Sequence, residues 1–520
     1  MIAEITQLLT ILSTMTPNQL EERLLLLGSR LVEDDWSGLL YGIEELAQNG
    51  RAELAERLMA VCLQVAQENE DSWAFRAVNY FLGHVYHLQG QVERAIEAYQ
   101  LVVASGLEAV DVDGRIQASM ALSSMARMQM AQGYVVEAVP HIQHAIAIGE
   151  SLGREADVVG DQLTLAGLYL IQEDFTRSED LLQQTLARAQ QLGHPELTAL
   201  ALMRLASLQE DLNQPAAAMF YYESALRLLE DVDQPEDDDV FFMTYREILV
   251  GLAMAYEALD QPEEAIDYYA EASRLTHWLG DARNQAVVLT WLGTAQLAAG
   301  QPRLALRSFK AAERLAQQSG HTWWLGTNSF FQASAWQALV EWDLAETAVK
   351  QAMHYHAAAP GEHSADEAGC LIKLGEIAMD RDAFDTAVAH YQQALTVLDR
   401  VEIGQMHRLI YLRLGEAYWV QCQFSQAYEA LWQALDVYES KRQTVSALWA
   451  RVDYAPSRDL VYEYLARTCL ALGKVVETFM AVEEGRMRVF REQLAAWPTT
   501  DKPIESLDWS DIKPLLCLES

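Results

Sequence analysis

The sequence predicts an all-α solenoid, an array of helix–turn–helix units stacked along the chain. Three observations support this fold class. The unit is visible twice with little variation, around Ala265 and again around Ala305, with matching positions 40 residues apart. The chain has 520 residues, more than a single compact core holds. Hydrophobic residues make up 51% of it, while 27 Gly and 12 Pro are too few for long disordered segments.

Each copy is predicted to have two helices joined by a short turn that contains Gly, Asp or Pro. Small residues stand where the two helices must approach closely, and Tyr or Phe fills the adjoining hole. Six of the nine steps between copies are 40 residues, and the others are 43, 47 and 42. The small residue that begins the second helix marks ten copies: Ala55, Ala95, Ala138, Ser178, Ala218, Ala265, Ala305, Ala345, Ala387 and Ala427.

The motif resembles the tetratricopeptide repeat (TPR). One copy reads Gly251-Leu252-Ala253-x-x-Tyr256, followed by Ala265-x-x-x-Tyr269-x-x-Ala272. The commonest TPR has about 34 residues, so this period adds about 1.5 helical turns. It is similar to the long-helix TPRs of kinesin light chains and of bacterial peptide-sensing regulators. The resemblance implies a right-handed superhelical solenoid of about ten to eleven repeats.

Five segments are expected along the chain. Residues 1–35 are predicted to form two N-terminal capping helices. Residues 36–356 hold repeats one to eight, and residues 357–440 hold repeats nine and ten after a connector. Residues 441–497 form a C-terminal helical hairpin, and residues 498–520 follow it. The acidic stretch at residues 230–239 lacks the Gly and distal Glu of an EF-hand, which favours a solvated connector over a Ca²⁺ site.

The C-terminal hairpin and the residues after it resemble a second family. The stretch Ala481-Val482-Glu483-Glu484-Gly485-Arg486-Met487-Arg488 is similar to the hairpin that precedes a CHAT domain, a caspase-like protease module attached to bacterial TPR arrays. Residues 507–516 resemble the first helix of such a module. The module's own catalytic His and Cys would lie beyond Ser520. We therefore expect a TPR–CHAT protein cut near this junction, or a relative that lost the protease.

Charge and composition limit the partners. Lys and Arg total 37 against 75 Asp and Glu, a formal net charge of −38. Nucleic acid and anionic membranes would be repelled, so a protein or peptide with apolar or basic surface is the favoured partner. Five scattered cysteines without a Cys-x-x-Cys pair fit a reducing compartment. The start lacks a signal peptide's basic residues, and no run of 18 apolar residues exists, so we expect a cytoplasmic protein.

No group of residues predicts catalysis, a cofactor or a metal. No Cys or Ser has a nearby base and oxyanion hole in its sequence context, and there is no phosphate-binding Gly loop. Metal sites need three or four convergent ligands, and the histidines offer two on a helix or three around a connector. We therefore expect that the chain is not an enzyme. The histidines in question are His84 with His87, His141 with His144, and the group His354, His356 and His363.

The first helices of a TPR superhelix line its concave groove, which identifies a set of candidate partner-binding residues. Among them only Arg127 is basic, so the carboxylate clamp of chaperone-binding TPRs is missing. A groove of Met, aromatic and Glu side chains favours an apolar or basic peptide. Packing between repeats is an equal alternative for each residue. The set is Tyr80, His84, His87, Arg127, Met130, Met203, Glu210, Met254, Glu257, Phe330, Gln337, Glu376, Met379, Glu416 and Trp419.

Six of the 13 tryptophans fall between residues 278 and 342. Large rings fill wide gaps between long repeats, and tryptophan is also enriched at interface hot spots. Packing is the favoured interpretation for most of the six. Trp323 and Trp324 are the candidate surface anchors.

The combined resemblances imply a non-catalytic protein-binding and peptide-binding scaffold. It would be the regulatory arm of a caspase-like CHAT protease, in cis or in trans, in a bacterial defence or signalling system. Partner binding would shift the populations of solenoid conformations and so reposition the protease. A CRISPR-type effector is one candidate partner. The alternatives are a stand-alone peptide sensor and an assembly adaptor.

Overall fold

A computed structural model describes residues 33–442 except 49, 110, 231, 233–238, 360, 362 and 399–403, together with residues 456–474, 477, 478 and 481. The described residues form helices and turns without a strand, which confirms the predicted all-α class. Most of the predicted capping helices, the centre of the acidic stretch, most of the C-terminal hairpin and residues 498–520 lie outside the described residues. No described helix has the length and apolarity needed to cross a bilayer.

The chain divides into two compact units. The described residues of the first lie within Met1–Gln209 and Phe220–Phe241, and those of the second lie within Glu210–Met219 and Phe242–Ser520. We call them the N-terminal unit and the C-terminal unit. The N-terminal unit contains α3 (Glu33–Gln48), α4 (Ala52–Glu68), α5 (Ser72–Leu88), α6 (Val92–Glu108), α7 (Val112–Ala131), α8 (Val135–Leu152), α9 (Glu155–Ile171) and α10 (Phe175–Leu192).

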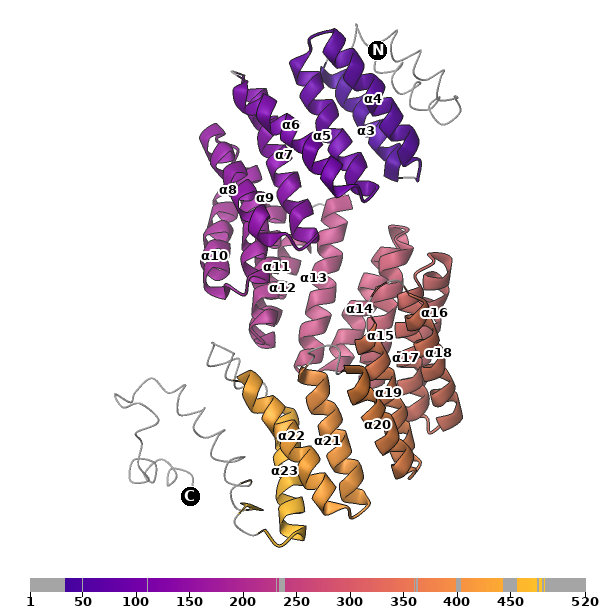
Figure 1. The fold of residues 1–520 in the computed structure, drawn as a ribbon. Coiled ribbons are helices and arrows are strands. Elements are labelled where there is room, and N and C mark those ends of the chain that lie inside the picture. The colour runs from indigo at the N-terminus through magenta and orange to yellow at the C-terminus, as the bar shows by residue number, and fades with distance from the viewer. Residues whose placement is uncertain are drawn as a thin grey trace, which may run out of the picture. The chain divides into compact units, whose positions relative to one another are not determined.

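Three helices are shared between the units by this division: α11 (Pro195–Asp211), α12 (Pro215–Glu230) and α13 (Asp239–Ala258). The C-terminal unit continues with α14 (Pro262–Trp278), α15 (Ala282–Ala298), α16 (Pro302–Gln318), α17 (Thr322–Ala338), α18 (Trp342–Ala358), α19 (Ser364–Asp380), α20 (Phe384–Leu398), α21 (Gly404–Val420), α22 (Phe424–Arg442) and α23 (Pro456–Ala471). Figure 1 shows successive helices running up and down side by side within each unit.

The ten predicted helix pairs are present, from α3 with α4 to α21 with α22. The residue predicted at the contact within each pair is fully buried in all ten, from Ala55 to Ala427. Small side chains there let two helices pack closely along one face. The structure thus confirms the repeat register that the sequence predicts.

Each pair is joined by a turn with one residue in the left-handed region. In most of these turns the next residue donates its backbone N–H to the preceding helix, as from Gln91 to the Tyr86 carbonyl at 2.9 Å and from Gln301 to the Gln296 carbonyl at 2.8 Å. This is a C-terminal capping motif that satisfies carbonyls at the helix end. Its left-handed residues recur at the repeat spacing: Gly50, Gly90, Gly133, Glu173, Asn213, Asp260, Gly300, Val340, Asp382 and Cys422.

Two kinds of favourable helix start occur more than once. The side chain of Asp71 accepts a hydrogen bond from the Ala74 N–H at 2.9 Å, and Asp281 accepts one from the Asn284 N–H at 3.0 Å. Such N-caps satisfy backbone donors that have no partner within the helix. Pro302 instead occupies the first turn of α16, where a missing N–H costs nothing.

Candidate partner-binding surface

Within each unit, the first helices of successive pairs contact one another. In the N-terminal unit α3 contacts α5, α5 contacts α7, and α7 contacts α9. In the C-terminal unit the same holds for α15 with α17, α17 with α19, and α19 with α21. Among α4, α6, α8 and α10, and among α14, α16, α18, α20 and α22, second helices of successive pairs make no comparable contact. Helices that crowd together lie on the concave side of a curved stack, so the first helices line the inner surface within each unit.

A polar cluster crosses four first helices on the inner surface of the N-terminal unit. His84 on α5 contacts Glu44 on α3, with 2.8 Å between Nδ1 and Oε1. The hydroxyl of Tyr80 lies 3.2 Å from that of Ser124 on α7. Arg127 donates to the same Ser124 oxygen at 3.3 Å. The structure therefore brings three predicted groove residues together, Tyr80, His84 and Arg127, and adds Glu44 and Ser124 to them.

Asp161 extends this cluster onto α9. It is buried, with 5% of its surface exposed. Burial raises the pKa of its carboxyl to about 6, while contact with Ser123 and the positive charge of Arg127 act in the opposite direction. A buried acid beside an arginine is retained against its desolvation cost, which is a common feature of binding sites.

An apolar pocket of about 220 Å³ adjoins the polar cluster. The rings of Tyr41 and Phe81 pack edge to face within it, 4.9 Å between centroids. Tyr41 is 63% exposed and Met120 is 40% exposed, so both are open to solvent. The pocket is lined by Ser37, Tyr41, Trp73, Ala77, Tyr80, Phe81, Asp113, Ile116, Gln117 and Met120. Of these, Tyr80 belongs to both the pocket and the polar cluster. The pocket suits an apolar side chain, and the acids Glu44 and Asp113 beside it suit a positive charge.

The inner surface of the C-terminal unit carries charges that neutralise one another. Lys373 contacts Glu376 at 2.6 Å within α19. Arg413 on α21 contacts Glu376 at 3.3 Å and Glu416 at 2.9 Å. Lys373 also lies over the ring of Phe330, 5.8 Å from its centroid. Three predicted groove residues, Phe330, Glu376 and Glu416, are thus brought together with two basic residues that the groove register did not select.

The other predicted groove residues lie in varied surroundings. Met203 is 4% exposed and packs inside its repeat, which is the core alternative considered above. His87 is exposed, Met254 is exposed, and Met130, Glu210 and Met379 are half-buried. Glu257 accepts a hydrogen bond from Tyr269 at 2.7 Å. Gln337 donates to Asp380 at 2.6 Å, and the indole N–H of Trp419 is buried without a partner among the described residues.

The tryptophan pair predicted as a surface anchor sits beside the histidine group. Trp323 is 38% exposed and donates its indole N–H to Asp366 at 3.0 Å, while Trp324 is half-buried. The Nδ1 atom of His363 lies 3.0 Å from the same carboxylate, and that of His356 lies 3.8 Å from it. Burial lowers the pKa of His356. Among the described residues no three His, Cys, Asp or Glu side chains converge as metal ligands.

Two models of a known repeat family match parts of the chain. A tetratricopeptide-repeat family model matches residues 162–231 and 244–318, and a second such model matches residues 77–105. No curated protein matches the chain.

Several solved structures are similar in part. BtubC (BKLC) from P. vanneervenii is 23% identical, with a TM-score of 0.38 over 49% of this chain and 94% of that one. A Rap protein complexed with competence and sporulation factor is 11% identical, with a TM-score of 0.43 over 71% and 98%. A putative kinesin light chain from Podosopora anserina with nearly identical TPR-like repeats is 22% identical, with a TM-score of 0.32 over 40% and 97%. The family matches and the ten helix pairs together show that the chain carries tetratricopeptide repeats in an all-α solenoid.

Proposed function

We propose that this chain is a non-catalytic scaffold that binds a protein or peptide through the inner surface of its N-terminal unit. The observation that carries the proposal is the exposed apolar pocket between α3, α5 and α7 with the polar cluster at its edge. The partner is a segment with one apolar side chain for the pocket and a basic side chain for Glu44 or Asp113. Apolar and aromatic walls with a few placed polar groups are the usual composition of ligand-binding pockets.

Peptide selection on the purified chain tests this proposal. Peptides chosen from a random library would be titrated against the chain and two variants by calorimetry. Met120→Glu puts a charge in the pocket, and because Met120 is partly exposed the fold should persist. Val136→Glu is the matched control on the second helix α8, where Val136 is 77% exposed. We expect apolar and basic peptides that lose affinity at least about tenfold in Met120→Glu only. Peptides that bind both variants equally would show that the pocket is not the binding site.

The finer role that we propose is regulation of a caspase-like CHAT protease. Its support is the resemblance of the stretch Glu483 to Arg488 and of residues 507–516 to a CHAT junction. These residues lie outside the described part of the chain. The intact mass of the native protein provides the test. A mass well above 58.4 kDa, with protease sequence after Ser520, supports the proposal. A mass equal to this chain's, with no protease co-purifying, contradicts it and leaves a peptide sensor or an adaptor.

A further inference from the structure

A row of basic side chains runs along the second helix α16. Arg303, Arg307, Lys310 and Arg314 follow one another at intervals of four, three and four residues, which places them on one helix face. All four are exposed. None of them forms an ion pair with a described residue. Several basic residues on other second helices do pair, as Lys350 does with Glu346 at 2.6 Å.

This arrangement opposes the average charge of the chain. Four basic residues and one acid, Glu313, lie on α16, in a protein whose formal net charge is −38. At physiological salt the Debye length is about 8 Å, so a ligand at this face responds to the local charges rather than to the sum. The face is therefore locally attractive to anions.

Helix stability does not account for the row. Like charges four residues apart destabilise a helix by about 0.2–0.5 kcal/mol per pair, and Arg303 with Arg307 and Lys310 with Arg314 are two such pairs. Arg303 also lies in the first turn, where the helix dipole disfavours a positive charge. The helix itself therefore gains nothing from the row, and the four charges are available to bind an anionic partner.

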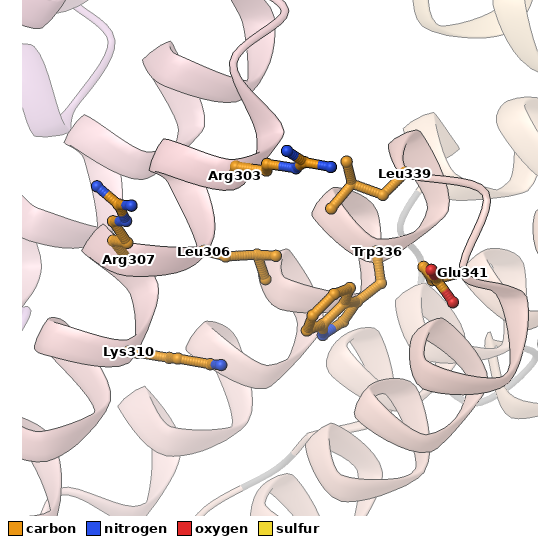
Figure 2. A pocket seen from close by; sticks show the side chains of 7 residues that line it. All are labelled: Arg303, Leu306, Arg307, Lys310, Trp336, Leu339 and Glu341. Atoms are coloured by element: carbon orange, nitrogen blue, oxygen red, sulfur yellow. The ribbon is translucent and has the colours of Figure 1, made fainter.

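The row borders a pocket of about 360 Å³. Arg303, Arg307 and Lys310 line one side of it, and Trp336 and Leu339 at the end of α17 line the other (Figure 2). Lys310 lies over the Trp336 ring, with Nζ 5.7 Å from the centroid. Leu306 forms the pocket's apolar wall on α16. Glu341 is its single acid, and Figure 2 shows it beyond Trp336 as viewed from α16.

We propose that this pocket is a second docking site, which takes an acidic peptide segment of a partner protein. Carboxylates of the segment pair with Arg303, Arg307 and Lys310, and one aliphatic side chain of the segment packs against Leu306, Trp336 and Leu339. Charge complementarity selects this partner, and the apolar wall favours a peptide over a free anion. Because α16 is a second helix, the site lies off the inner surface, and the scaffold can hold two partners of opposite charge.

Fluorescence anisotropy with a labelled peptide of alternating Asp and Glu around one central Leu tests the site. We expect binding that weakens with added salt and weakens at least about tenfold in Arg307→Glu/Lys310→Glu. Arg204→Glu removes another exposed arginine that forms no ion pair with a described residue, on α11, and should change the affinity less than twofold. Circular dichroism should show unchanged helicity in the double variant, because its substitutions relieve repulsion along α16.

Three outcomes would overturn the proposal. The first is no binding of the acidic peptide, and the second is equal binding to the double variant. The third is binding of pyrophosphate or single-stranded RNA that depends on Arg307 and Lys310 while the peptide does not bind. A matched peptide of Asn and Gln around Leu should not bind. Met120→Glu, on the inner surface, should leave acidic-peptide binding intact, so failure of this site and failure of the inner pocket are distinguishable.

Discussion

Gly293 lies directly against the ring of Phe309. A Cβ atom at residue 293 would stand 2.3 Å from Cε1 of Phe309, which is closer than real Cβ contacts allow. The ring itself is fully buried. The same relationship joins Gly375 to Tyr391 in the ninth repeat. In each case a glycine on the first helix lets an aromatic ring of the second helix fill the space between them.

Gly293→Ala should therefore destabilise the chain, by about 1–3 kcal/mol, because the buried Phe309 ring has little room to shift. Urea unfolding measures the change. Gly167→Ala is the control: it is also helical, and its nearest neighbour would be the Met130 sulfur at 3.8 Å. That control should be neutral or stabilising, by up to about 1 kcal/mol, since alanine favours helices. Equal destabilisation of the two variants would contradict steric contact as the cause.

The helix pairs could be predicted because their signal is local and repeated. A small residue at the contact and an aromatic residue near it recur at one spacing, and the ten contacts are buried as that spacing implies. The turns were less predictable. Their left-handed residue is glycine in four repeats but Glu173, Val340 or Cys422 in others, since the capping hydrogen bonds are formed by backbone atoms whatever the side chain.

The candidate sites depend on geometry that periodicity does not contain. Tyr41, Trp73 and Met120 meet in one pocket because α3, α5 and α7 are rotated to face it, and residue spacing within one helix gives no such rotation. The net charge of the chain is likewise an average that says nothing about local patches. A net charge of −38 predicts basic or apolar partners, yet it averages over α16, where the positive charges lie together.

Val340→Gly should stabilise the chain. Val340 has a φ of 65°, in the left-handed region where a β-branched side chain is strained. It is 63% exposed, so little buried surface is lost with the side chain. We expect a gain of about 0.5–1 kcal/mol, because relief of strain exceeds the added entropy of the unfolded chain. Thermal unfolding measures it. Val136→Gly, in the regular helix α8, should instead cost about 1 kcal/mol. A loss in both variants would show that Val340 is unstrained.

Asp161→Asn should make stability less dependent on pH. The folded pKa of Asp161, about 6, lies above the unfolded value of about 3.9. The folded state therefore holds the proton more tightly, so this group's contribution to stability is largest below pH ~4 and is lost as pH rises to about 6. Asparagine does not ionise, so the variant does not lose this stability as the pH rises. We expect the variant to be more stable by about 1–2 kcal/mol near pH 7.5, with the difference shrinking near pH 4. A constant difference across this range would show that Asp161 does not titrate as described.

Two tyrosines at the same repeat position should respond oppositely to loss of the hydroxyl. Tyr269 donates to Glu257 at 2.7 Å. The hydroxyl of Tyr391 is buried without a partner among the described residues, because Met379 stands where a residue like Glu257 would accept its hydrogen bond.

Tyr269→Phe leaves the half-buried Glu257 without its hydrogen-bond donor, and burial already raises the pKa of this carboxyl. We therefore expect the free energy of unfolding to fall by about 1–3 kcal/mol. Tyr391→Phe removes an unsatisfied polar group and should be neutral or stabilising, by up to about 1 kcal/mol. Urea unfolding of both variants measures the contrast. Met379→Gln should then reverse the second result, because a new acceptor for Tyr391 makes Tyr391→Phe destabilising in that background. Equal costs for the two phenylalanine variants in the native background would show that the Tyr391 hydroxyl has a partner after all.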